Sequence, residues 1–240
     1  MNTKLGRVVA TLTLGVIALL APAPAPTGAA EVATAVEGPD EVRLNEIQTV
    51  GSHNSYHLAA SPEESDIREA FIGAANDLMM YTHAPLGEQF AEQKVRQIEL
   101  DIFRDDAGGK YANPLLRAAA GHGAYDPAMN QPGTKVLHVQ DVDYRSNCLS
   151  LVSCLTTIEA WSDANPDHLP LAILLELKDD VVPLDGFPFV VPDPWNAAAM
   201  DALDAEIRTV VDEADMITPD DVRGDAETLE GAVLSTGWPT

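Results

Sequence analysis

Apolar and polar positions along the chain form patterns that predict strands separated by helices. Ile98, Leu100 and Ile102 alternate with polar residues, as expected for a strand with one buried face. The run "LAILLELK" at residues 171–178 is nearly continuous in apolar residues, which is typical of a strand buried on both faces. The predicted strands span residues 47–50, 95–103, 135–140 and 171–178.

Helix-start signals lie between and after these strands. The sequence "SPEE" at residues 61–64 is a capping box with proline at the first helical position, and it predicts a helix that runs to about Met80. Residues 105–134 are rich in glycine and predict a long loop. Strands that alternate with helices predict parallel βα units, an α/β fold and a TIM-type barrel. Three further helices are predicted to start at Thr156, Asp193 and Thr218.

The N-terminal 35 residues have the organisation of a signal peptide and leader. Lys4 and Arg7 precede a short apolar segment, and small residues follow, which predicts cleavage after Ala30 or Ala35. An anchor that remains uncleaved is the alternative. We expect a secreted protein with no transmembrane segment after cleavage, and a folded domain over residues 41–240.

Composition limits the partners of this domain. The formal net charge of −24 argues against nucleic acid as a partner and against attraction to anionic membranes. Either the acids serve solubility, or some of them are gathered to bind a cation. Cys148 and Cys154 predict one disulfide in an oxidising compartment, and zinc is the weaker alternative because C-x5-C is an unusual ligand spacing. No feature implies a protein partner.

Charged side chains accompany two of the predicted strands. Glu99 and Asp101 share one face of their strand, because side chains alternate across it. A single E-x-D pair is more commonly the solvated face of an edge strand. Glu176 and Lys178 end the most apolar strand, where an ion pair between them is the simplest interpretation. In a parallel barrel, however, the carboxyl ends of the strands converge at one mouth.

The segment "TVGSHNSYHL" at residues 49–58 brings further chemistry to that mouth. Gly51 permits a turn that places His53 and Asn54 after the first strand. A lone strand histidine such as His138 is more often a core residue than a catalyst. We interpret His57 as loop structure. Four oxygen donors from three segments fit a hard cation such as Ca²⁺, and His53 and His138 fit proton transfer; the donors are Asn54, Glu99, Asp101 and Glu176.

The order of these motifs resembles the Ca²⁺-dependent phosphoinositide-specific phospholipases C, most closely their bacterial secreted branch. The resemblance covers about residues 44–240 and is carried by "GSHNSYH", "IELDIF", "VLHVQDVDYRSNC", "LAILLELKDD" and "TPDDVRG". Calcium-free bacterial relatives have aspartate after the first histidine, so Asn54 favours the calcium version. The resemblance implies catalytic roles for His53 and His138 and calcium ligation by Asn54, Glu99, Asp101 and Glu176, and Lys178 could neutralise a substrate phosphate.

The resemblance also implies an activity. It implies a phosphoric diester hydrolase with Ca²⁺ as cofactor and a phosphatidylinositol-type phospholipid at a membrane surface as substrate, attacked through the inositol 2-hydroxyl. Such barrels have eight strands, and this sequence predicts four, so we expect residues 41–240 to form roughly the first half of the barrel. The alternatives are a glycerophosphodiester phosphodiesterase-like barrel, whose first motif normally reads His-Arg, and a non-catalytic secreted module that binds Ca²⁺ and phospholipid.

Overall fold

The computed structural model describes residues 42–182 and 186–240 of the chain. The predicted leader and its cleavage sites lie outside the described residues. None of the described helices has both the length and the apolar character that a bilayer crossing requires. The strands are β1 (Val50–Gly51), β2 (Val95–Phe103), β3 (Lys135–Val136) and β4 (Ala172–Leu177). The helices are α1 (Pro62–Ile72), α2 (Leu86–Ala91), α3 (Leu115–Ala119), α4 (Leu151–Asp163), α5 (Ala197–Ile207), α6 (Pro219–Arg223) and α7 (Leu229–Thr236).

Strand β2 lies at the centre of an open, mixed four-stranded sheet. Both β1 and β4 run parallel to β2, and the β2–β4 register places Asp101 opposite Glu176. β3 pairs with the last residues of β2 in the antiparallel direction. The chain is therefore a mixed α/β protein, as predicted, and its described strands form an open sheet.

The prediction of a third parallel strand over residues 135–140 is wrong. β3 ends at Val136, and the chain then folds into a tight turn in which Val139 and Asp143 exchange backbone hydrogen bonds of 2.9 and 3.0 Å. Asp141 has a φ of 68° in this turn, a left-handed conformation that aspartate tolerates better than most residues. His138 therefore lies in the turn and not within a strand.

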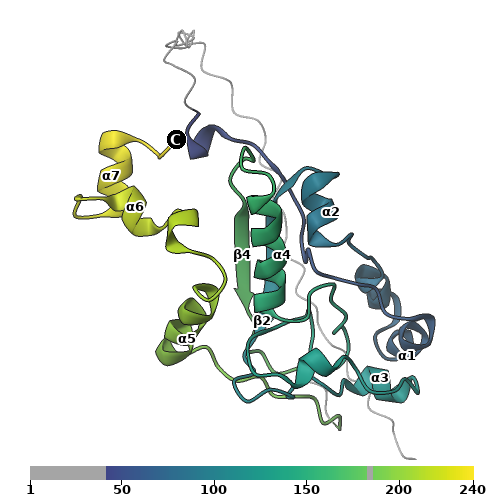
Figure 1. Cartoon of the computed structure of the whole chain (residues 1–240). Helices are drawn as coiled ribbons and strands as arrows, with labels where there is room; N and C mark the ends of the chain where they lie inside the picture. The colour runs from purple at the N-terminus through teal and green to yellow at the C-terminus, as the bar shows by residue number, and fades with distance from the viewer. Residues whose placement is uncertain (1–41, 183–185) are drawn as a thin grey trace, which may run out of the picture. The chain divides into compact units, whose positions relative to one another are not determined.

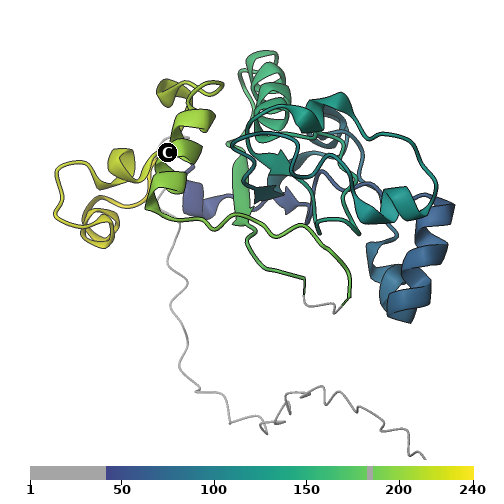
Figure 2. The same ribbon diagram turned by 90° about the horizontal axis from the view of Figure 1, so that it is seen from below.

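One face of the sheet carries the larger hydrophobic core. Ile98, Leu100 and Ile102 of β2 are buried there against α2 and α4, as their alternation predicts. The views in Figure 1 and Figure 2 both show α4 alongside the sheet. Leu203 of α5 belongs to the same cluster. Because this face takes the apolar side chains, Glu99 and Asp101 point to the opposite face.

Strand β4 is less buried than its apolar sequence predicts. Ile173 and Leu175 pack against the core, whereas Leu174 is 53% exposed on the other face. The reason is that β4 pairs only with β2 among the described strands, so neither its outer edge nor its second face is covered by another strand. A continuous apolar run alone could not show this.

Several helix boundaries differ from those predicted. The first helix stops at Ile72 because Gly73 takes a φ of 58°, and a 3₁₀ turn, Gly73–Met79, follows. Helix α4 starts at Leu151 and not at Thr156, because the side chain of Ser150 caps it. The predicted loop at 105–134 contains α3 and a 3₁₀ turn, Pro127–Asn130. Asn196 caps α5, two residues after Pro194, and Thr218 caps α6 as predicted.

The predicted disulfide between Cys148 and Cys154 is confirmed. It joins the segment before α4 to the first turn of that helix, and Cys154 is fully buried in the core. Replacing both cysteines with alanine should lower the free energy of unfolding by about 2 kcal/mol, the loop-closure value for so short a loop. Urea unfolding of this double variant and of the oxidised parent would measure the difference, and equal midpoints would contradict the prediction.

Candidate active site

Three carboxylates meet at the carboxyl ends of the two longest strands. Glu99 and Asp101 come from β2 and Glu176 from β4, and one oxygen from each lies within 4.8 Å of the others. They converge because β2 and β4 are parallel and Asp101 is paired with Glu176 in their register. The structure therefore brings together three of the four residues that the sequence singled out as cation ligands.

Asp101 carries the strongest sign of a cation site. Its side chain is 1% exposed, and within the described residues neither carboxylate oxygen accepts a well-aligned hydrogen bond; the ammonium of Lys178, 3.2 Å from Oδ2, is its ion-pair partner. Burial raises the pKa of Asp101 above its usual range, and the nearby charge of Lys178 only partly opposes this shift. A buried carboxylate without hydrogen-bond donors is costly unless a cation stabilises it. This carboxylate is therefore suited to bind a metal ion.

Lys178 supplies the one positive charge that contacts this cluster among the described side chains. Its ammonium lies 2.9 Å from Glu176 Oε1 and 3.2 Å from Asp101 Oδ2. The hydrogen bond from Lys178 lowers the pKa of Glu176. One ammonium cannot balance three carboxylates, so the cluster keeps a negative charge that favours a divalent cation. A contact between Lys178 and a substrate phosphate stays a prediction.

Asn54 lies beside the carboxylates through its main chain. Its φ is 48°, a left-handed conformation that asparagine adopts more readily than most residues, and its backbone N–H points at Glu99 Oε2 from 3.4 Å. Its side-chain amide donates to the hydroxyl of Tyr81 at 2.9 Å and accepts from Tyr56 at 3.3 Å. Tyr56 also lies near Asp101, and burial together with that charge raises the pKa of Tyr56.

The two histidines predicted to exchange protons both lie near the carboxylates. The His53 side chain is 74% exposed, and its Nε2 lies 3.7 Å from Glu99 Oε2. The His138 side chain is 23% exposed and lies near Asp101 and Glu176, where a protonated imidazole would favour the ionised carboxylates. Both imidazoles therefore border the carboxylate cluster.

Sequence reasoning missed the partner of His138. Its Nδ1 forms a 2.7 Å hydrogen bond with Asp143, which also contacts His57 and Arg68. His57, interpreted from sequence as loop structure, is fully buried in this network. No sequence motif predicts the contact between Asp143 and His138, because it depends on a turn that is seen only in the structure.

The donors of the carboxylate cluster fit calcium. Glu99, Asp101 and Glu176 offer carboxylate oxygens, and calcium binds such oxygen ligands in preference to nitrogen or sulfur. Ligation by the Asn54 amide stays a prediction, because its oxygen accepts a hydrogen bond from Tyr56. An oxygen-rich cation site bordered by two imidazoles is the arrangement of a metal-assisted hydrolase.

Comparison with known families gives a specific assignment. The model of the family described as "Phosphoinositide phospholipase C, Ca2+-dependent" matches residues 42–240. The chain belongs to this family, which confirms the resemblance seen in its sequence motifs. Family membership implies a phospholipase C-like activity on a lipid substrate. No curated protein and no solved structure gives a significant match.

Proposed function

We propose that this protein is a secreted, Ca²⁺-dependent phosphoric diester hydrolase that cleaves phosphatidylinositol-type phospholipids. The single observation that carries the proposal is the convergence of Glu99, Asp101 and Glu176 around the poorly compensated charge of Asp101, next to His53 and His138. Family membership supports the same reaction class. In this proposal the site occupies the mouth of a barrel, at the carboxyl ends of the parallel strands β2 and β4.

In the proposed reaction the inositol 2-hydroxyl oxygen bonds to phosphorus, and the phosphorus–oxygen bond to diacylglycerol breaks. One group must take the proton of the attacking hydroxyl, and another must give a proton to the leaving oxygen. His53 and His138 divide these two roles, because they are the imidazoles that border the carboxylate cluster. Lys178 lies where it can offset negative charge on a phosphate oxygen.

Calcium, when bound, supplies positive charge that stabilises a phosphoryl oxygen and lowers the pKa of a hydroxyl. The residues that would hold it are Glu99, Asp101 and Glu176, with Asn54 from the loop after β1. Asp101 has the least freedom, because its carboxylate is buried below the others. Glu176 is 47% exposed at its side chain and can adjust to the ion.

Cleavage of phosphatidylinositol in vesicles, with calcium or with a chelator, tests the proposed function. We expect release of diacylglycerol and of an inositol phosphate that requires calcium. Calcium-dependent binding to the vesicles without release would instead identify a binding module. Cleavage of glycerophosphodiesters but not of phosphatidylinositol would identify the phosphodiesterase-like alternative, which family membership disfavours.

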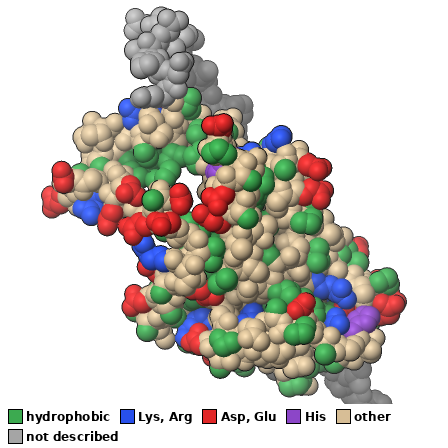
Figure 3. Space-filling model, in the orientation of Figure 1, with side chains coloured by type: hydrophobic (Ala, Val, Ile, Leu, Met, Phe, Trp, Pro, Cys, Tyr) green, Lys and Arg blue, Asp and Glu red, His purple; other side chains and the backbone are tan. Residues whose placement is uncertain are grey.

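Exposed apolar side chains on and after α1 support a lipid substrate. Phe71 of α1 is 61% exposed and meets Phe187 edge to face, with ring centroids 5.3 Å apart. Leu78 is 78% exposed in the 3₁₀ turn that follows α1. Met80, directly after this turn, contacts the guanidinium of Arg68. Red acidic side chains are spread over the face shown in Figure 3, so attraction to anionic lipids cannot hold the protein at a bilayer. Exposed apolar side chains such as Phe71 and Leu78 can hold it there by entering the bilayer surface.

Replacing Leu78 with serine should weaken binding to phosphatidylinositol vesicles by about tenfold, because a side chain of this size contributes ~1.5–3 kcal/mol when it is fully buried. Cleavage of a short-chain, water-soluble substrate should remain unchanged. Leu234 of α7 is a matched control, since it is 80% exposed, and Leu234→Ser should change neither measurement. Equal losses for the two variants in a vesicle sedimentation assay would contradict a specific lipid contact at Leu78.

Secretion is part of the proposal and rests on the charged, apolar and small-residue pattern of residues 1–35. The disulfide supports it, because such bonds persist in oxidising compartments. The mature protein should begin between Ala30 and Val36. N-terminal sequencing of protein collected from the medium would measure this, and material that begins at Met1 would contradict cleavage.

A further inference from the structure

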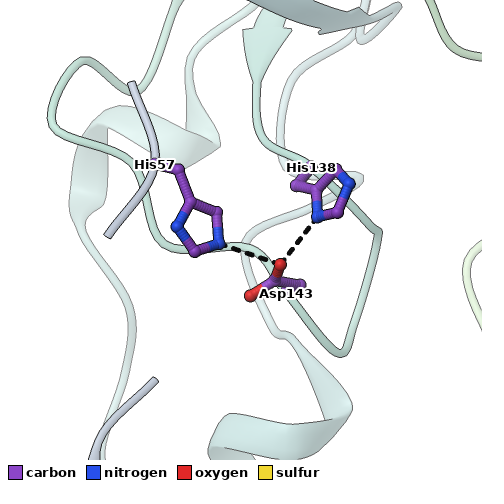
Figure 4. A group of neighbouring side chains, drawn as sticks. All are labelled: His57, His138 and Asp143. Atoms are coloured by element: carbon purple, nitrogen blue, oxygen red, sulfur yellow. Dashed lines mark hydrogen bonds and ion pairs between the residues drawn. The ribbon is translucent and has the colours of Figure 1, made fainter. Parts of the chain in front are cut away.

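A single buried carboxylate, that of Asp143, joins His138 to a second histidine, His57. Asp143 Oδ2 is 2.7 Å from His138 Nδ1 and 2.9 Å from His57 Nε2 (Figure 4). Its other oxygen is 2.7 Å from the guanidinium of Arg68. The side chains of Asp143, His57 and Arg68 are each at most 2% exposed. Only His138 extends from this group toward solvent.

The fold holds Asp143 in this place by several independent contacts. The tight turn at residues 139–143 returns the chain onto His138, and the backbone N–H of His138 donates to the carbonyl of Asp143. Arg68 of α1 donates to the carbonyl of Val142 as well as to the carboxylate, and to Asn76. The carboxylate therefore has little freedom to move relative to the imidazole of His138.

Hydrogen-bond polarity then determines where the protons lie. A carboxylate only accepts, so both imidazole nitrogens that face Asp143 must carry a proton. The other nitrogen of His57 lies 2.9 Å from the carbonyl oxygen of Tyr81, which also only accepts. His57 therefore faces an acceptor on each side of its ring, and its Nε2 donates to Asp143. His138 needs a proton only on Nδ1, because its Nε2 makes no hydrogen bond with any described residue.

The side chains of His57, His138 and Asp143 lie close enough together to surround a metal ion. The charge distribution opposes this alternative, because Arg68 already neutralises the carboxylate. His57 would also have to lose the proton that it gives to Asp143, and its second nitrogen is engaged with Tyr81. A hydrogen-bonded support for His138 accounts for every contact of Asp143. A metal ion would instead replace the hydrogen bonds that Asp143 makes with His57 and with His138.

We propose that Asp143 is a positioning residue: held by Arg68 and His57, it keeps His138 in the tautomer protonated on Nδ1, which leaves Nε2 free to exchange a proton with the substrate. The inference rests on the proposed function for its catalytic consequence, but the tautomer is a property of the protein alone. Burial raises the pKa of Asp143, but the hydrogen bonds from His138 and His57 and the charge of Arg68 lower it further, to about 2. The carboxylate therefore stays ionised throughout the neutral range.

Asp143→Asn tests the proposal, because it keeps the shape and replaces one acceptor oxygen by a donor N–H₂. Arg68 retains the amide oxygen, so the amide N–H₂ faces His138 and should force its proton onto Nε2. Nitrogen-15 NMR of the imidazoles should show His138 protonated on Nδ1 in the parent and on Nε2 in the variant. The turnover number should fall about 10³–10⁴-fold with little change in KM, the size of effect seen when an analogous aspartate that orients a histidine is replaced.

A second buried aspartate provides the matched control. Asp105 pairs with Lys135 at 3.1 Å, and both side chains are at most 2% exposed. Asp105→Asn should cost comparable stability but should change neither the tautomer of His138 nor the turnover number. His57→Gln, whose amide can still donate to Asp143, should lower the turnover number by less than about tenfold, as expected for a group that does not transfer protons itself.

The outcomes separate this inference from the proposed function. An Nδ1-protonated His138 that shifts in Asp143→Asn, in a protein that does not cleave phosphatidylinositol, would support the positioning role and contradict the proposed function. A parent protein with His138 protonated on Nε2 would overturn the inference, and this measurement does not need the variant to fold. Unchanged turnover in a folded Asp143→Asn would overturn it as well.

Discussion

Replacing His138 with alanine should lower the rate of calcium-dependent phosphodiester cleavage by ~10²–10⁴-fold, the usual cost of losing a general acid or base. The affinity for calcium should stay nearly constant, because His138 borders the carboxylates without being one of the proposed ligands. The rate is measured on phosphatidylinositol at saturating calcium. Calcium binding is measured separately by isothermal titration calorimetry, so that the two effects are not confused.

A matched histidine controls for the loss of an imidazole. His168 precedes the amino end of β4, whereas Glu176 lies near the carboxyl end of that strand, and the imidazole of His168 hydrogen-bonds Ser162 and the carbonyl of Leu169. His168→Ala should leave both the rate and the calcium affinity unchanged. If calcium affinity fell in parallel with the rate in His138→Ala, His138 would act as a ligand and the proposed division of roles would be wrong.

Replacing Glu99 or Glu176 with glutamine should lower the affinity for calcium, in contrast to the replacement of His138. Each change keeps the shape of the side chain but removes one negative charge from the cluster, and ligand charge is a main determinant of calcium affinity. We expect the affinity to fall by ~10–100-fold, with part of the lost activity recovered at higher calcium. Addition of calcium should also raise the unfolding temperature of these variants less than that of the parent, because a ligand that binds more weakly stabilises the folded state less at the same concentration.

An acidic residue outside the cluster tests whether the effect is local. Glu159 of α4 lies near other acids, whose charges add to burial in raising its pKa, but it belongs to no candidate cation group. Glu159→Gln should leave calcium affinity and activity unchanged. The proposed ligand set would be refuted if calcium affinity were unchanged in Glu99→Gln and Glu176→Gln but lower in Glu159→Gln.

The residues with the clearest local signals were the ones that the sequence located correctly. Glu99 and Asp101 could be placed on one face of β2 because side-chain alternation is a property of any extended strand. The cap of α6 at Thr218 follows a pattern of adjacent residues. Predictions failed where local signals compete, as at α4, where Ser150 starts the helix before the capping box predicted at Thr156.

The network around His138 could not be predicted in this way. Arg68 and Asp143 are 75 residues apart, and His57 and Asp143 are 86 residues apart. A hydrogen bond across such a separation depends on how helix α1, the loop after β1 and the turn after β3 pack together. Neither periodicity nor spacing carries that information, since the same residues could equally face solvent.

The sequence by itself determined the alternation that gives β2 one apolar and one acidic face, the pair of cysteines and the motifs of the phospholipase family, because these depend on neighbouring residues in the chain. The tertiary structure alone decided that β3 runs antiparallel, that Asp101 is buried with only Lys178 as its ion-pair partner among the described residues and that Asp143 joins His138 to Arg68. These features depend on long-range packing, in which the free energy of burying a charge is balanced by partners that the chain brings from distant segments.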